Sequence, residues 1–144
     1  MFQLGSEMPE PYMAGILQAL APLLQELPNK LSLAGHTDSL PYSGGHTGYS
    51  NWELSSGRAN AARRILAKAG LNDDRFLRVI GAANRIPLQI GDTDHPANRR
   101  ISILVLSKIK EHEIRLEDSR NGDLEDGQIT IGHQHLQGYI DGYK

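Results

Sequence analysis

A predicted helix at residues 50–69 carries an arginine among side chains that should face a core. Ser50 and Glu53 have the spacing of a capping box, which predicts that the helix begins there, and Gly70 predicts its end. At about 100° per residue, the apolar stripe of the later turns is continued toward the N-terminus by Asn51, Leu54, Ser55 and Arg58. An unpaired buried charge is strongly unfavourable, so the fold must bring a carboxylate or a strong acceptor to this arginine.

The remaining pattern predicts a mixed fold of class α/β (α+β). Apolar residues at helical spacing predict a helix at 11–27, and alternating or β-branched stretches predict strands at 31–38, 76–82 and 100–107, with a further short strand at 2–4. Helices that alternate with strands favour a two-layer sandwich, a small mixed sheet of about four strands with two main helices on one face.

The length and composition indicate one globular domain with flanking segments. The chain has 144 residues, no cysteine and a net charge of −2, which argues against disulfides and against a nucleic-acid footprint. No stretch approaches the roughly 20 apolar residues that cross a bilayer. We expect a leading segment at 1–10, the domain at 11–107, and a charged helix or flexible tail at 108–144.

The predicted partner of Arg58 is Asp38, which ends a predicted strand beside the start of the helix. Two interpretations remain open at this point. The pair could be a structural ion pair that joins a loop to the helix, or it could be a clamp for a ligand with both an amine and a carboxylate. Arg99 and Arg100 alternate along a strand, so only one of them should face the same groove, and we favour Arg99.

Three separated motifs carry a family resemblance. "GHTD" at 35–38, "SNWELSSGRANAARRIL" at 50–66 and "NRRISILVL" at 98–106 resemble the OmpA-like peptidoglycan-binding domain. The forms "HTDSLPY" and "YSNWELS" are most similar to the C-terminal periplasmic part of the flagellar motor stator B subunit, the MotB family.

The resemblance implies noncovalent binding of the diaminopimelate-containing stem peptide of peptidoglycan, with no catalytic residue, cofactor or metal. Asp38 and Arg58 occupy the positions of the ligand clamp. The same motifs assign six further residues to ligand binding: Thr37, Asn51, Leu54, Ser55, Asn98 and Arg99.

The resemblance also implies a cellular role. It suggests a homodimeric periplasmic domain of a protein anchored in the inner membrane, which fastens a stator complex to the cell wall. A stator A subunit would bind through a transmembrane part that these residues do not show. In this family, wall binding is expected on activation, and residues 1–12 are where such a change would act.

Three alternatives stay open. One is a general OmpA- or Pal-type wall anchor unconnected with the motor. Another is a metal-dependent murein hydrolase built on His36, Asp38, His46 and His95, although none of the common hydrolase motifs is present. The third is a pure dimerisation module with no affinity for the wall.

Overall fold

A computed structural model describes residues 1–42 and 48–122. The chain divides into two units, Met1–Glu111 and His112–Lys144, and the sheet lies in the first. The elements are α1 (Pro11–Glu26), β1 (Leu31–Gly35), α2 (Asn51–Lys68), β2 (Phe76–Gly81), β3 (Ile101–Val105) and α3 (Lys108–Gly122), with the short 3-10 helices η1 (Asp73–Arg75) and η2 (Pro96–Asn98).

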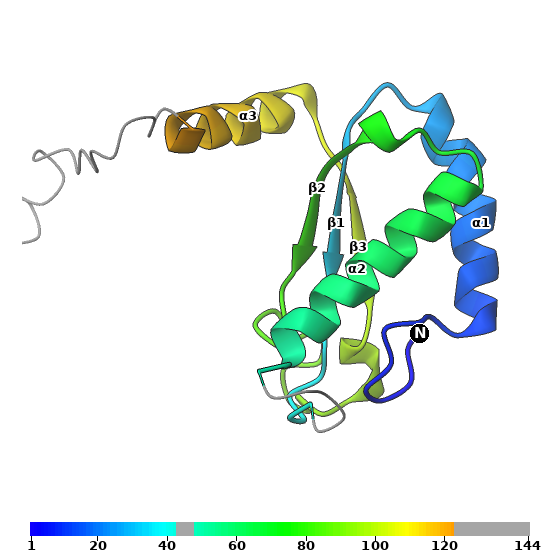
Figure 1. Ribbon diagram of the computed structural model, residues 1–144, viewed down its shortest axis with the longest axis vertical. Coiled ribbons are helices and arrows are strands. Elements are labelled where there is room, and N and C mark those ends of the chain that lie inside the picture. The colour runs from blue at the N-terminus through cyan, green and yellow to red at the C-terminus, as the bar shows by residue number, and fades with distance from the viewer. Residues whose placement is uncertain (43–47, 123–144) are drawn as a thin grey trace, which may run out of the picture. The chain divides into compact units, whose positions relative to one another are not determined.

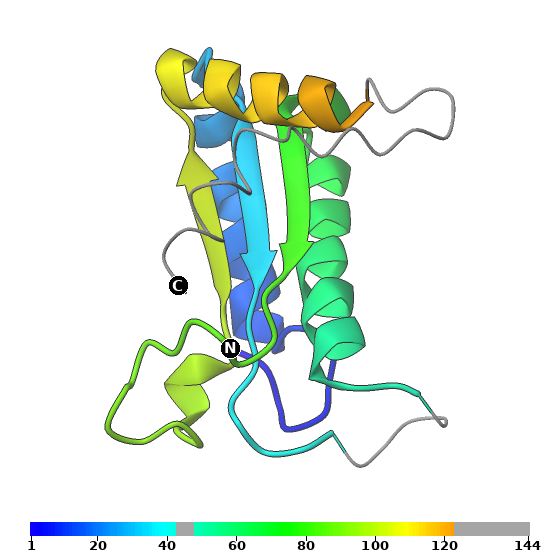
Figure 2. The same ribbon diagram turned by 90° about the vertical axis from the view of Figure 1, so that its left-hand side faces the viewer.

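The sheet and its two helices form two layers. The strand order is β2-β1-β3, with β1 parallel to β2 and antiparallel to β3. Helices α1 and α2 lie on the same face of the sheet (Figures 1 and 2). The predicted two-layer α/β fold is therefore confirmed.

The described residues contain three strands where about four were predicted. Residues 2–4 form no strand, and Phe2 makes only an isolated bridge to Pro9. The backbone carbonyls of Phe2 and Gln3 accept hydrogen bonds from arginine side chains instead. A backbone carbonyl that bonds to an arginine side chain is less available to a neighbouring strand, so a short segment of this kind does not pair in the sheet.

The core lies between the sheet and the helices. Leu31 and Leu33 of β1 are fully buried, and β1 is the central strand. Its inward side chains pack against residues of α1, α2 and the segment after α2, namely Leu17, Ala21, Leu24, Ala62, Leu66 and Leu71.

Helix α1 buries a narrower stripe than its sequence predicts. The periodicity placed Ile16 and Leu23 on the core face, yet they are 47% and 60% exposed. The contact line runs through Leu17, Ala21 and Leu24 instead. A helix with apolar residues on more than one third of its circumference does not reveal from sequence which of them touch the core.

Helix α2 begins with the predicted capping box. The Ser50 hydroxyl accepts from the Trp52 backbone N–H at 3.2 Å, and the Glu53 carboxylate accepts from the Ser50 backbone N–H at 2.7 Å. The Ser50 hydroxyl also lowers the pKa of Glu53 by hydrogen bonding to its carboxylate. These contacts fix where the helix starts, and therefore where Asn51 and Arg58 lie.

Helix α2 lies directly against the end of β1. A side chain on Gly35 would overlap the backbone carbonyl of Ser55, so only glycine permits this approach. The strand ladder also ends at Gly35, earlier than the predicted residue 38, because the Thr37 N–H leaves it to donate to the Ala83 carbonyl. Residues 36–38 are consequently free to face the start of α2.

The predicted charged helix after residue 107 is present as α3, whereas the predicted flexible tail at 123–144 lies outside the described residues. Residues 43–47 also lie outside the described residues. In the part of the chain that the structure describes, no helix has the length and apolar character needed to span a bilayer.

The cap on α2 yields a stability prediction. Ser50→Ala removes the acceptor for a helix N-terminal N–H, and should lower the free energy of unfolding by about 1 kcal/mol in urea titrations followed by circular dichroism. Ser119→Ala, which removes an exposed hydroxyl on α3, should change it by less than about 0.5 kcal/mol. Equal effects of the two substitutions would contradict the role of the cap.

Candidate functional site

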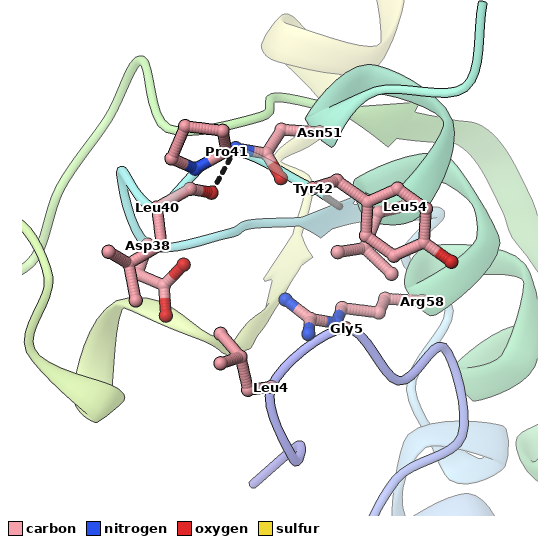
Figure 3. Close-up of a pocket in the computed structure, with 9 residues that line it drawn as sticks. All are labelled: Leu4, Gly5, Asp38, Leu40, Pro41, Tyr42, Asn51, Leu54 and Arg58. Atoms are coloured by element: carbon pink, nitrogen blue, oxygen red, sulfur yellow. Dashed lines mark hydrogen bonds between the residues drawn. The ribbon is translucent and has the colours of Figure 1, made fainter. Parts of the chain in front are cut away.

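A pocket of about 320 Å³ opens between the start of α2, the loop after β1 and the N-terminal segment. Figure 3 shows Asp38 and Arg58 directed into it from opposite sides. It is lined by Leu4, Gly5, Asp38, Leu40, Pro41, Tyr42, Asn51, Leu54 and Arg58.

Arg58 is fully buried at the base of this pocket and is held by backbone carbonyls. Its Nε donates to Ser6 O at 2.8 Å, Nη1 to His36 O at 3.0 Å, and Nη2 to Gln3 O at 3.2 Å. Its guanidinium carbon also lies 4.8 Å from the centroid of the Phe2 ring. The guanidinium thus joins the N-terminal segment to the end of β1.

Among residues 1–42 and 48–122, no carboxylate bonds directly to Arg58. Burial lowers its pKa to about 10, with Asp38 acting in the opposite sense and Arg99 adding repulsion. Arg58 therefore stays protonated near neutral pH. Three of its five N–H groups donate to carbonyls, so one N–H on each Nη is left for a further acceptor.

The predicted ion pair between Asp38 and Arg58 is wrong. The Asp38 carboxylate accepts instead from Nη1 of Arg99 at 2.8 Å, and both side chains are largely buried, at 4% and 16% exposure. Arg99 also donates through Nε to Phe2 O at 3.0 Å. Asp38 and Arg58 interact only through space, and the Glu7 carboxylate also attracts the Arg58 charge.

The N-terminal segment was predicted to lead into the domain and to be where activation acts, and no residue of it was predicted to line the site, yet it forms one side of the site. Leu4 and Gly5 line the pocket, and Glu7 accepts a hydrogen bond from the Tyr49 hydroxyl. The Glu7 carboxylate rests where a side chain on Gly57 would lie. Gly57 therefore has a packing role that its position in the motif did not reveal.

Asn51 and Leu54 lie where the motif predicts. Asn51 donates through Nδ2 to the Leu40 carbonyl at 2.9 Å, which ties the pocket loop to the first turn of α2 (Figure 3). Leu54 is buried and supplies apolar lining.

Thr37 and Ser55 stand behind the pocket and do not line it. Both are buried, and both contact Ala83: the Ala83 carbonyl accepts from the Thr37 N–H, and the Ser55 hydroxyl accepts from the Ala83 N–H. Ala83 has φ +46°, a left-handed conformation that costs energy without such bonds. Thr37 and Ser55 therefore support the structure around the pocket without lining it.

Asn98 and Arg99 have different tasks. Arg99 reaches Asp38, whereas Asn98 is fully buried and turns its amide into the loop between β2 and β3. Arg100 points the other way and donates to the Ile86 carbonyl, as the alternation of a strand predicts.

Sequence reasoning missed Leu4, Gly5, Leu40, Pro41 and Tyr42, all of which line the pocket. They lie in irregular segments with no periodic signal. The one available clue was the need of Arg58 for acceptors, which backbone carbonyls of any segment can meet.

The described residues of the hydrolase alternative, His36, Asp38 and His95, form no metal site. No cluster of three histidine or acidic side chains is placed to hold a metal ion within residues 1–42 and 48–122. His95 caps η2, and the His36 ring contacts the Ser102 hydroxyl at 3.1 Å. His46 lies outside the described residues.

This fold, with its acid and arginines at the end of the central strand, defines a member of the OmpA family, and residues 1–100 match that family. Motility protein B of Escherichia coli K12 is 50% identical over 84% of this chain, which spans 39% of that protein. The putative truncated flagellar export/assembly protein LafU of the same strain is 36% identical over 85% of this chain and 57% of its own length. The chain belongs to the OmpA family, as predicted, and spans less than half of motility protein B.

Solved structures agree in fold. The C-terminal domain of Helicobacter pylori MotB has a TM-score of 0.65 at 17% identity, covering 87% of this chain and 96% of that domain. The cell wall anchor of the T6SS from Pseudomonas aeruginosa has a TM-score of 0.62 at 23% identity, covering 75% and 76%.

The contacts of Arg58 make it a structural residue as well. Arg58→Lys keeps the charge but cannot reach three carbonyls, and should lower the free energy of unfolding by about 2–4 kcal/mol in urea titrations. Arg64→Lys, on the exposed side of the same helix, should change it by less than about 0.5 kcal/mol. Similar losses for both would show that the carbonyl contacts contribute little.

His36 should make stability depend on pH. Burial lowers its pKa from 6.5 to about 4, and Arg100 adds repulsion. His36 therefore takes up a proton near pH 6.5 in the unfolded chain but only near pH 4 in the folded chain. Because the unfolded state binds more protons between these values, the free energy of unfolding falls as the pH falls through this window. We expect this residue alone to remove about 2 kcal/mol between pH 7.5 and pH 5 in urea titrations.

His36→Gln is the control, because glutamine does not titrate and the carboxylates of the chain remain the same. The loss of stability between the two pH values should be smaller in this variant by the same amount. An identical loss in both proteins would assign the pH dependence to other groups.

Proposed function

We propose that this chain binds the stem peptide of peptidoglycan in the pocket between Asp38 and Arg58. The observation that carries the proposal is the fully buried Arg58 guanidinium, to which no carboxylate of the described residues bonds directly, beside Asp38, which is bonded to Arg99. A buried guanidinium that is bonded only to neutral carbonyls favours a ligand that brings a carboxylate of its own.

The two sides of the pocket suit the two ends of an amino acid. The Arg58 guanidinium offers N–H donors to a carboxylate, and the Asp38 oxygen not bonded to Arg99 offers an acceptor to an ammonium group. Diaminopimelate carries both groups on its side chain, which agrees with the clamp positions implied by the family motifs.

Ligand binding must change the N-terminal segment. Arg58 is 0% and Asp38 only 3% exposed, so the charges are covered in this conformation. A ligand carboxylate gains Arg58 by taking the place of the carbonyls of Gln3 and Ser6, which are neutral and therefore weaker acceptors. Residues 1–10 thus act in binding, in keeping with the expected role of 1–12.

The cellular role follows from the relatives. Half of the aligned positions are identical to motility protein B, and a structural neighbour is described as a cell wall anchor. These likenesses support a binding protein and not an enzyme. We propose that the chain is the periplasmic, homodimeric part of an inner-membrane stator subunit, anchoring a flagellar motor to the wall beside a stator A subunit.

Sedimentation with murein tests this proposal. The protein should pellet with insoluble diaminopimelate-type murein, and free meso-diaminopimelate should release it. Nα-Acetyl-lysine amide keeps a side-chain ammonium group but has no carboxylate, and it should not compete. Asp38→Asn keeps the shape but removes the charge, and should weaken binding about tenfold or more, because charge-assisted hydrogen bonds contribute about 1.5–3 kcal/mol.

The matched control is Asp73→Asn, an exposed carboxylate away from the pocket that should pellet like the parent. Circular dichroism establishes that each variant is folded before comparison. A parent that stays in the supernatant contradicts wall binding, and an Asp38→Asn variant that pellets like the parent contradicts the clamp.

A further inference from the structure

The Asn98 side chain is fully buried and uses its whole amide within one loop. Its Oδ1 accepts from the backbone N–H groups of Leu88 and Gln89 at 2.8 and 2.9 Å. Its Nδ2 lies 3.0 Å from Thr93 O, 3.2 Å from Asp92 O and 3.4 Å from Gln89 O. One side chain therefore bonds to both ends of the loop at 88–93.

That loop is bonded to the wall of the pocket through Ser39. The Ser39 backbone N–H donates to Thr93 O at 3.1 Å, and its hydroxyl donates to Thr93 Oγ1 at 2.9 Å and also contacts the Asp94 carboxylate. Ser39 stands between Asp38 and Leu40, which both line the pocket.

The two sets of bonds meet at a single atom. The Thr93 carbonyl oxygen accepts from Asn98 Nδ2 on one side and from the Ser39 N–H on the other. A carbonyl oxygen has two lone pairs and serves two donors well. The position of Thr93 O, and with it that of Ser39, is thus set by a side chain that does not itself line the pocket.

We infer that Asn98 is a positioning residue for the proposed ligand site: it holds the Asp38–Leu40 wall in place through Thr93 and Ser39. The inference rests on the proposed function for its consequence in binding. It gives residue 98 a role other than the ligand contact that the motif implied, and it separates that role from the direct bond of Arg99 to Asp38.

Asn98→Asp distinguishes the two sets of hydrogen bonds that the Asn98 amide makes. The carboxylate still accepts from the Leu88 and Gln89 N–H groups, but it has no N–H to donate to Thr93 O and repels that carbonyl. Hydrogen exchange of the Ser39 amide should then accelerate about tenfold, while exchange at 88 and 89 stays slow. The affinity for free meso-diaminopimelate, measured by calorimetry where the variant is fully folded, should fall about tenfold.

A merely structural asparagine would lower the melting temperature without these two changes. Asn60→Ala, which removes an amide that bonds only within α2, is the control and should match the parent in both measurements. Asn98→Ser is the milder variant should the aspartate not fold, since its hydroxyl is too short to reach both ends of the loop.

Parental exchange at Ser39, or parental affinity, in a folded Asn98 variant overturns the inference. The exchange measurement needs no ligand. A parent that fails to bind diaminopimelate therefore overturns the proposed function, while Ser39 exchange still decides whether Asn98 positions the wall.

Discussion

The buried guanidinium of Arg58 is the constraint on which the rest of this structure depends. Its donors bond to the carbonyls of Gln3, Ser6 and His36, which belong to the N-terminal segment and to the end of the central strand. Hydrophobic burial alone gives the two-layer arrangement of helices and sheet. The arginine also restricts the path of the chain. Its buried guanidinium cannot be hydrated, so the N-terminal segment and the end of β1 must bring backbone carbonyls to its N–H groups.

A hierarchy of polar contacts surrounds that arginine. Arg99 neutralises Asp38, Asn51 ties Leu40 to α2, and Asn98 braces the loop behind Ser39. Each of these contacts uses a side chain from a regular element, or next to one, to hold an irregular segment. The pocket consists largely of loops, yet its shape derives from the helix and the strand that hold them.

The parts of the fold set by local signals could be predicted from the sequence. The capping box at Ser50, the apolar periods and the β-branched strand gave the elements, and motif order gave the family. The partner of Asp38 could not be predicted, since Arg58 and Arg99 are both plausible by spacing and only tertiary geometry decides between them. The carbonyls of Gln3 and Ser6 could not be predicted either, because every residue type carries a carbonyl and sequence does not say which one lies nearby.

The bonds from Arg58 to Gln3 and Ser6 also bear on how such domains move between proteins. The first regular element begins at Pro11, and a recombination event that joined a new partner there would preserve every helix and strand. It would nonetheless leave an arginine in the core with two of its three acceptors lost. The unit that recombination must keep together therefore begins before α1. A junction is tolerated only ahead of Gln3 and Ser6, whose carbonyls accept hydrogen bonds from Arg58.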